Sequence, residues 1–391
     1  MDIYEHVPHE IDEVLSFRNE IFGYISPEHW RAMGCTAVVA RDGGQLVGFI
    51  PLQFREQCLR PGVTIPVVYE NAVGVAEDRR GQGLGTKMMD VAAGFISDRV
   101  DAMMVIRGSE RSPGYRFYRK CGHGDVGYVR NYVLSSETAL SPASVSGISV
   151  LSREQWIEME ASLLACYEAQ YGHFGGGRKR RPGYWRTILD GHVYRAREWL
   201  TVVFQPEPDR LAGYMVAVRG LWADTDEIYI YEVVGEDEHT VEQLVRYARS
   251  LSVSGAVVGH EMSLANPVCG VLKRMGFEER NTSPHLMARI LCPDRIFGRL
   301  AAGSGLLEAL SLVINTPHRS ISVNEPKDPR YRVTMETKEG LLSRLFLCRL
   351  NLEAAIEMEM VRWNVDDQGL ARALYETFAF AEWVQWFTDY V

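Results

Sequence analysis

One short run of glycines and arginines has the residue types needed to bind phosphate. The segment from Val75 to Thr86 reads Val-Ala-Glu-Asp-Arg-Arg-Gly-Gln-Gly-Leu-Gly-Thr. Glycines let the backbone bend tightly and bring N–H groups close to a ligand without interference from a Cβ. A helix that begins directly after such a turn adds free N–H donors and a partial positive charge, and arginines add charge-assisted hydrogen bonds. The run therefore predicts a seat for a pyrophosphate group.

The surrounding pattern places this run between a strand and a helix. Residues 67–75 are predicted as a strand, and apolar residues recur from Leu84 to Phe95 with the spacing of one helical face. A Walker A loop does not fit, because Thr86-Lys87 reverses the order that it needs, and GxGxG replaces the GxGxxG of a dinucleotide fingerprint. A tight turn without a ligand is the plain alternative.

The composition is that of an ordinary globular protein. The 391 residues carry a formal net charge of −9, so nucleic acid and anionic membranes are poor candidates as partners. We find no apolar stretch long enough for a transmembrane helix and no signal-peptide pattern at the N-terminus. The seven scattered cysteines favour reduced thiols in a cytoplasmic protein. The histidines show no metal-ligand spacing, and no metal is expected.

The order of predicted elements repeats once along the chain. Residues 1–137 are predicted as mixed α/β, and a linker rich in Ser, Ala and Pro follows. Residues 148–292 repeat the same order, which indicates duplicated domains. Residues 293–391 are predicted as a small α+β domain, with strand-like alternation in 330–337 and 346–360 and two amphipathic segments at 366–378 and 381–390.

A second signal follows the glycine run in the segment Gly114–His123, which reads Gly-Tyr-Arg-Phe-Tyr-Arg-Lys-Cys-Gly-His. Together with Arg80–Gly85 (Arg-Gly-Gln-Gly-Leu-Gly), it resembles the R/Q-x-x-G-x-G/A and lYxxxGF motifs of the GNAT superfamily of N-acetyltransferases. Tyr118 precedes Gly122 by four residues, where this family commonly places a tyrosine acid, and His123 replaces the usual Phe.

The resemblance implies how coenzyme A would bind. Backbone amides of the glycine run would bind the pyrophosphate, and the strand edge before it would pair with the pantetheine arm. The cofactor-binding residues implied in this way are Val73, Val75, Arg79, Arg80, Gly81, Gln82, Gly83, Leu84, Gly85 and Thr86.

Acetyl transfer from a thioester to an amine needs a neutral amine, donors for the oxyanion and a proton for the departing thiolate. We predict that Tyr118 supplies this proton, since a phenol can do so once the sulfur carries charge. Glu70, on the strand that enters the glycine run, is a candidate base, although strand register decides where its side chain points. Cys121 is a weaker candidate for a covalent intermediate, because cysteines beside helix ends are usually inert.

The second repeat keeps the scaffold and lacks both motifs. The turn Gly235-Glu236-Asp237-Glu238 is acidic and should repel pyrophosphate. Further on, Leu272 occupies the tyrosine position of an lYxxxGF-like segment. The glycine- and arginine-rich run at residues 175–182 is either a flexible, solvated loop or a contact to an active site or an oligomer partner.

Two GNAT-like units ahead of a small α+β domain resemble the enhanced intracellular survival acetyltransferase family, as does the run from Arg178 to Trp185. This resemblance implies two tandem GNAT-like folds, a sterol-carrier-protein-like tail and a homo-oligomer such as a hexamer. It also implies that the terminal carboxylate, here that of Val391, is the base. A frayed, solvent-exposed terminus is the alternative.

The sequence therefore predicts an acetyl-CoA-dependent N-acetyltransferase that acts on a primary amine, with a small cationic molecule favoured by the negative net charge. Two alternatives stay open. One is an acyl-CoA sensor without catalysis, and the other is a lipid-binding scaffold in which the tail is the functional part.

Overall fold

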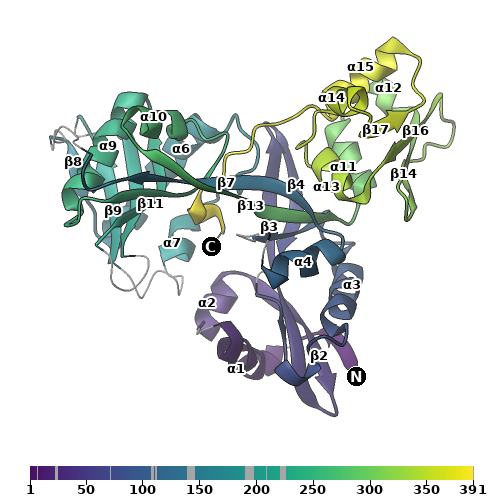
Figure 1. Cartoon of the computed structure of the whole chain (residues 1–391), viewed down its shortest axis with the longest axis horizontal. Helices are drawn as coiled ribbons and strands as arrows, with labels where there is room; N and C mark the ends of the chain where they lie inside the picture. The colour runs from purple at the N-terminus through teal and green to yellow at the C-terminus, as the bar shows by residue number, and fades with distance from the viewer. Residues whose placement is uncertain are drawn as a thin grey trace. The chain divides into compact units, whose positions relative to one another are not determined.

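The computed structural model describes residues 1–391 outside 7, 23–24, 71, 107–109, 111, 139–145, 190–197, 208, 221–225 and 391. The described chain folds into two compact units (Figure 1). Unit 1 comprises Met1–Pro27, Gly34–Gly127 and Pro284–Glu382, and unit 2 comprises Glu28–Met33, Tyr128–Ser283 and Trp383–Val391.

The first sheet of unit 1 has the strand order β1-β2-β3-β4-β6-β13, with β5 paired to β3. Its strands are β1 (Asp2–Glu5), β2 (Cys35–Asp42), β3 (Gln45–Arg60), β4 (Val63–Tyr69), β5 (Gly74–Val75), β6 (Ala102–Ile106) and β13 (Glu278–Ile290). The helices of this part of unit 1 are α1 (Ile11–Phe22), α3 (Leu84–Ile96) and α4 (Pro113–Lys120). Helix α2 (Pro27–Ala32) belongs to unit 2 from Glu28 on. β4 and β6 are parallel, so α3 forms the crossover between them.

Helix α3 packs its apolar stripe onto this sheet. Met88 and Ala92 are fully buried, with Ile96 one turn further on, among sheet residues such as Val38 and Ile50. The helix is therefore as predicted, but its buried face is rotated. Phe95, expected on that face, is 44% exposed, because a stripe of residues at every fourth position puts position 96 on the sheet.

Unit 1 also contains a second, mixed sheet of order β15-β14-β16-β17. Its elements are α11 (Pro293–Leu300), α12 (Gly305–Glu308), β14 (Leu310–Asn315), β15 (Ser320–Asn324), β16 (Tyr331–Thr337), α13 (Glu339–Phe346), α14 (Leu352–Glu357), β17 (Val361–Trp363) and α15 (Gln368–Thr377). The alternation at 330–337 does form a strand. That at 346–360 was wrong as a strand prediction, because Asn351 caps α14 and accepts a hydrogen bond from the Ala354 N–H.

The sheet of unit 2 has the order β7-β12-β11-β10-β9-β8. Its strands are β7 (Gly124–Leu134), β8 (Ile148–Val150), β9 (Glu198–Phe204), β10 (Gly213–Arg219), β11 (Ile228–Gly235) and β12 (Val257–Ser263). The helices are α5 (Arg153–Glu158), α6 (Glu160–Tyr171), α7 (Tyr184–Leu189), α9 (Glu238–Leu251) and α10 (Val268–Arg274). Residues 381–390, expected to be one amphipathic segment, run irregularly and end in the 3-10 turn Phe387–Tyr390.

The last strand of each repeat completes the sheet of the other repeat. β7 ends the first repeat and pairs with β12, with Val257 opposite Leu134. β13 ends the second repeat and pairs with β6, with Leu286 opposite Ile106. The two compact units therefore combine segments that are not consecutive in the sequence. The domain borders predicted at 1–137, 148–292 and 293–391 stay a prediction. Among the described residues, no helix is long and apolar enough to cross a membrane.

Candidate functional site

The glycine run forms an open turn at the N-terminus of α3. Gly81 and Gly83 have φ angles of 77° and 80°, a left-handed conformation that glycine adopts without strain. Gly83 is the N-cap of α3, and no side chain caps this end. Gly85 lets the turn approach α4, since a Cβ there would lie 3.0 Å from the Phe117 ring. The first N–H groups of α3 are thus left available to an anion.

A cavity of about 470 Å³ extends from this turn to α4. It brings together most of the predicted cofactor-binding residues and Tyr118. The lining residues are Val73, Val75, Arg79, Arg80, Gly81, Gly83, Leu84, Gly85, Thr86, Pro113, Gly114, Phe117, Tyr118 and Lys120. Gln82 does not line the cavity and donates instead to the Asp78 carbonyl, at 2.9 Å.

Three of the residues that line this cavity are basic. Arg79 forms an ion pair with Asp42 at 2.8 Å, and the Nε of Arg80 donates to the Val75 carbonyl at 3.1 Å. Lys120, which the sequence analysis did not select, lines the cavity from α4. It lies within the second motif, Gly114–His123, and this was the available signal.

Tyr118 stands on α4 with its ring buried and its hydroxyl toward the end of β4. Ser112 starts this helix by accepting a hydrogen bond from the Tyr115 N–H, and Pro113 occupies the first turn. The Tyr118 hydroxyl donates to the backbone carbonyl of Glu70 at 3.3 Å. This hydrogen bond is long, so an acceptor with better geometry can replace it.

The Glu70 side chain points at His123 and does not line the cavity. Both side chains have no exposed surface, and Oε1 of Glu70 contacts Nε2 of His123. Burial raises the pKa of Glu70 above its ordinary value, and the nearby His123 opposes this rise. The His123 ring also packs edge-on against Tyr118, with centroids 5.4 Å apart. The sequence signal for this pair was the histidine that stands where the motif has Phe.

Cys121 belongs to the buried core beside the cavity. The side chain is 5% exposed, and burial raises the pKa of its thiol to about 11. At neutral pH the group is therefore a protonated thiol, which is a poor nucleophile. This environment disfavours a covalent intermediate on Cys121.

The corresponding turn of unit 2 is closed by its own side chain. Asp237 is the N-cap of α9 and accepts a hydrogen bond from the Thr240 N–H at 2.7 Å. This hydrogen bond lowers the pKa of Asp237, so the carboxylate is ionised at neutral pH. The space at this helix end is about 170 Å³. Val391, the predicted C-terminal base, lies outside the described residues.

Comparison with known proteins identifies the domain that contains this cavity. Residues 5–123 match the model of the acetyltransferase (GNAT) family. The chain thus contains a GNAT acetyltransferase domain, and by this domain it is an acyltransferase. GNAT acetyltransferases use acetyl-CoA as co-substrate. No curated protein has a significant sequence match.

Several solved structures share the fold over 98% of this chain and 98% of their own. One is a probable N-acyltransferase from Enterococcus faecalis, with 14% identity and a TM-score of 0.72. Another is a GCN5-related N-acetyltransferase from Anabaena variabilis, with 13% identity and a TM-score of 0.71. Eis1 from Mycobacterium abscessus has 15% identity and a TM-score of 0.64. At these identities the likeness shows a mixed α/β, GNAT-like fold with tandem copies.

Proposed function

We propose that unit 1 transfers the acetyl group of acetyl-CoA directly to the primary amine of a small, cationic molecule. One observation carries this proposal. A single cavity joins the uncapped N-terminus of α3 to the buried hydroxyl of Tyr118. The first feature suits the pyrophosphate of coenzyme A, and the second suits the departing sulfur at the other end of the same molecule.

The cavity wall supports this orientation of the cofactor. Arg79 and Arg80 add positive charge near the α3 end, where a pyrophosphate would carry its negative charge. Val73 and Val75 line the wall between the two ends, as expected for residues that contact the pantetheine arm. Gln82 would contribute by fixing the shape of the turn, because its side-chain amide donates to the Asp78 carbonyl.

The chemistry then follows from few groups. A base takes a proton from the ammonium form of the acceptor, and the free amine attacks the thioester carbonyl. The tetrahedral intermediate collapses, the C–S bond breaks, and the Tyr118 hydroxyl gives its proton to the sulfur. To do this, Tyr118 exchanges its hydrogen bond to the Glu70 carbonyl for one to the sulfur. The attacking nitrogen gives up its second proton as the amide forms, and this proton restores the Tyr118 hydroxyl, whereas the proton on the base is released to solvent.

Two groups are proposed as the base. The carboxylate of Val391 is proposed from the resemblance stated for the sequence. Glu70 has a pKa that burial raises toward the range of a general base, but it meets the cavity only through neighbours such as Tyr118. We propose Val391 as the group that takes the proton and Glu70 as a residue that positions Tyr118 through His123.

Net charge, the second sheet of unit 1 and the family resemblance support the other features of the proposal. The net charge of −9 favours a cationic acceptor over nucleic acid or an anionic membrane as partner. The sheet β15-β14-β16-β17 with its helices is proposed as a sterol-carrier-like domain. A homo-oligomer of hexameric size in the cytoplasm is proposed from the resemblance. Light scattering of the purified chain tests the size, and a monomer would contradict it.

Calorimetric titration with acetyl-CoA, followed by an amine panel, tests the proposed function. We expect one binding site per chain and acetylation of at least one cationic amine. Gly83→Asp should weaken binding about 100-fold or more, because it adds a negative charge and a strained φ at the phosphate seat. Gly62→Asp is the matched control. Gly62 has a φ of 75° and open space around its Cβ, but it lies in the β3–β4 turn and should not affect binding.

The outcomes separate the alternatives. Binding without turnover on any amine would favour the acyl-CoA sensor. No binding of acetyl-CoA would overturn the proposal and leave the lipid-binding scaffold, which displacement of a hydrophobic dye by fatty acid would test. Equal loss of binding in both glycine variants would mean that the loss comes from backbone strain and not from the phosphate seat.

A further inference from the structure

Each copy of the fold contains a pair of parallel strands, and we call the space beyond the last residue pair in unit 2 the cleft of unit 2. In unit 1, the parallel pairing of β4 with β6 covers three residue pairs and ends at Tyr69↔Met104. In unit 2, the parallel pairing of β11 with β12 also covers three pairs and ends at Ile230↔Gly259. Each pair is joined by a crossover helix that follows a turn. The space beyond the last pair is therefore the same place in both copies of the fold.

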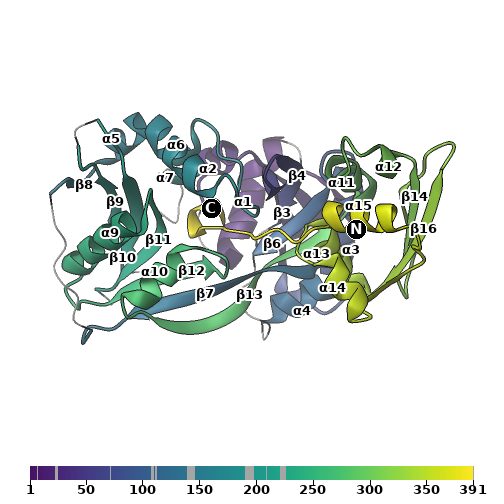
Figure 2. The same ribbon diagram turned by 90° about the horizontal axis from the view of Figure 1, so that it is seen from above.

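The C-terminal segment, residues 383–390, lies in this cleft of unit 2. Its Phe387 ring contacts both separated strands. The ring centroid is 4.3 Å from that of Tyr231 on β11 and 5.1 Å from that of His260 on β12. Figure 2 shows the segment (yellow) ending near α7, where the Tyr184 hydroxyl donates to the Thr388 carbonyl at 2.9 Å.

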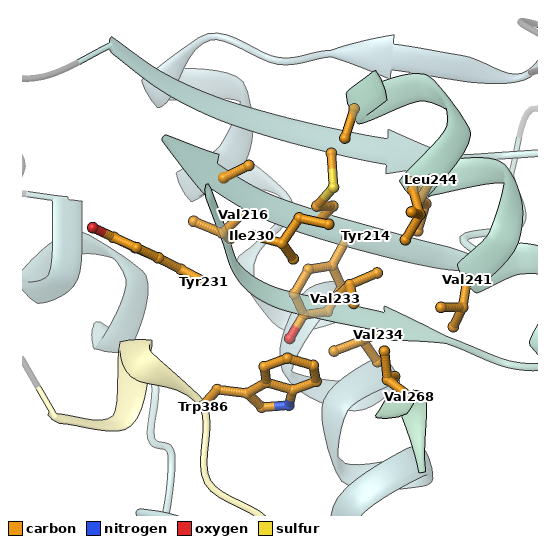
Figure 3. Close-up of a cluster of buried hydrophobic side chains, with 14 of the residues drawn as sticks. Tyr214, Val216, Ile230, Tyr231, Val233, Val234, Val241, Leu244, Val268 and Trp386 are labelled. Carbon is orange, nitrogen blue, oxygen red and sulfur yellow. The ribbon is translucent and has the colours of Figure 1, made fainter. Parts of the chain in front are cut away.

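The apolar part of the segment is built into the core of unit 2. Trp386 has no exposed surface, and its ring lies edge-on to Tyr171, with centroids 5.9 Å apart. Figure 3 shows the Trp386 ring reaching into the cluster that contains Tyr214 and Val268. Beside it, the Ser263 hydroxyl accepts from the Gln385 N–H at 2.8 Å and donates to the Gln385 carbonyl at 3.0 Å. The backbone of the segment is thus bonded to the side chain of Ser263, the last residue of β12.

A buried charge network recognises the end of the segment. Arg180 donates to Glu232 on β11 at 2.6 Å and to Asp389 of the segment at 2.9 Å. The three charged side chains are at most 3% exposed. Thr388 donates its hydroxyl to the same Glu232 carboxylate. Because a buried charge is stable only with its partners, this network ties the segment to β11.

The glycine run at residues 175–177 forms the seat of the segment. The Val384 N–H donates to the Gly175 carbonyl at 2.9 Å. Gly176 has a φ of 85°, and a Cβ there would lie 2.5 Å from the Cβ of Trp383. Of the two interpretations of this run, the structure supports a specific contact, and the partner is the chain's own C-terminal segment.

We propose that the cofactor cleft of the second copy has become a binding site for a peptide, and that its ligand is the C-terminal segment of the same chain. The segment crosses the place that corresponds to the pantetheine path of unit 1. The helix end that would hold pyrophosphate is capped by Asp237. The second copy therefore fixes the end of the chain and takes no acyl-CoA.

Hydrogen exchange of the intact chain tests this proposal without any measurement of acetyl transfer. We expect the amides of residues 384–389 in the wild-type chain to be protected well above an unstructured peptide. Gly176→Ala should speed their exchange about tenfold or more, because the new methyl group displaces Trp383. Exchange of the wild-type segment at the rate of a free peptide would overturn the proposal.

Gly183→Ala is the matched control. Gly183 has a φ of 89° and nothing within 4 Å of an added Cβ, so it carries the same backbone strain without the clash. In this variant, the amides of residues 384–389 should exchange at the rate of the wild-type chain. Equal effects of the two variants would mean that strain in the loop, and not the seat, governs the segment, which contradicts the proposal.

Saturating acetyl-CoA provides the second arm of the experiment. The proposal predicts that protection of residues 384–389 stays unchanged when acetyl-CoA is present, whether or not unit 1 binds it. Faster exchange in the presence of acetyl-CoA would show that the cofactor competes for the cleft, and this would overturn the proposal. Failure of acetyl-CoA to bind at all, seen by calorimetry, would count against the proposed function only.

Discussion

The N-termini of α3 and α9 differ in whether the protein caps them with a side chain of its own. At α3, Gly83 leaves the first N–H groups uncapped beside a cavity of about 470 Å³. At α9, Asp237 uses the same N–H groups for its own carboxylate, and about 170 Å³ remains. A helix N-terminus attracts negative charge in both cases. The difference lies in whether the protein supplies that charge itself.

The spaces beside these two helix ends also differ, because one is open and the other is filled by the protein itself. Unit 1 keeps its cleft open and lines it with backbone, basic side chains and Tyr118. Unit 2 fills its cleft with residues of its own chain, Trp386 and Phe387 among them. These side chains gain packing contacts that unfilled apolar space would lack.

Tyr118→Phe gives the largest expected effect on this comparison. The hydroxyl is the feature of the cavity that Leu272 lacks at the equivalent position of unit 2. We expect kcat to fall about 100-fold or more, since the departing thiolate loses its proton donor, while the affinity for acetyl-CoA stays the same. Steady-state kinetics and calorimetry on one preparation measure both.

Tyr115→Phe serves as the control for this variant. Tyr115 stands on the same helix, and its hydroxyl donates to Asp125 at 2.8 Å, away from the cavity lining. It should leave kcat within about twofold of the wild type. Full turnover of Tyr118→Phe would contradict the role of Tyr118 as the acid. The two copies would then differ only in whether they bind acetyl-CoA.

Much of the candidate site could be predicted because its residues are close in sequence. The glycine run, the start of α3 and Tyr118 lie in two short segments whose motifs carry local geometry. The position of α4 beside the run follows from the order of elements. Local pattern also explains why the strand at 330–337 was correct, since alternation reports one buried face.

The features that were missed depend on contacts between distant residues. No local pattern shows that β7 and β13 exchange sheets, because either pairing buries the same apolar faces. Likewise, the network of Arg180, Glu232 and Asp389 joins three segments far apart in sequence. The strand pattern of Glu70 left two directions open, and only the fold places its carboxylate against His123.

The two copies also differ in the partner of a buried glutamate, which directly follows β4 in unit 1 and lies on β11 in unit 2. Glu70 contacts His123, whereas Glu232 binds Arg180. We expect Glu70→Gln to lower kcat only about threefold, through a less well positioned Tyr118. Extending the chain by one glycine after Val391 should lower kcat about tenfold, because the carboxylate moves by up to about 3.5 Å.

The pH profile distinguishes these roles. Because burial raises the pKa of Glu70, a catalytic Glu70 would make kcat rise with pH through a limb above the ordinary carboxyl range. Glu70→Gln would then abolish that limb and cost far more than threefold. A glycine extension with unchanged kcat would remove Val391 as the base. Affinity for acetyl-CoA should stay constant in both variants, which controls for a damaged cofactor site.

Asp237→Ala gives the smallest expected effect and sharpens the comparison between the two helix ends. Loss of the cap should cost about 1 kcal/mol of unfolding free energy, as measured in urea at neutral pH. Since the Thr240 N–H lowers the pKa of Asp237, this contribution is present above the ordinary carboxyl pKa and is lost as pH falls through the lowered value. Asp367→Ala is the control, because Asp367 caps α15 in unit 1 with a 2.8 Å hydrogen bond.

Both cap variants should still bind one acetyl-CoA per chain. Removing Asp237 frees the N–H groups of α9, but the C-terminal segment continues to occupy the cleft that the pantetheine arm would need. A second acetyl-CoA site in Asp237→Ala alone would show that the cap is the sole barrier in unit 2. The C-terminal segment would then occupy the cleft only because Asp237 caps α9, and acetyl-CoA would displace the segment once that cap was removed.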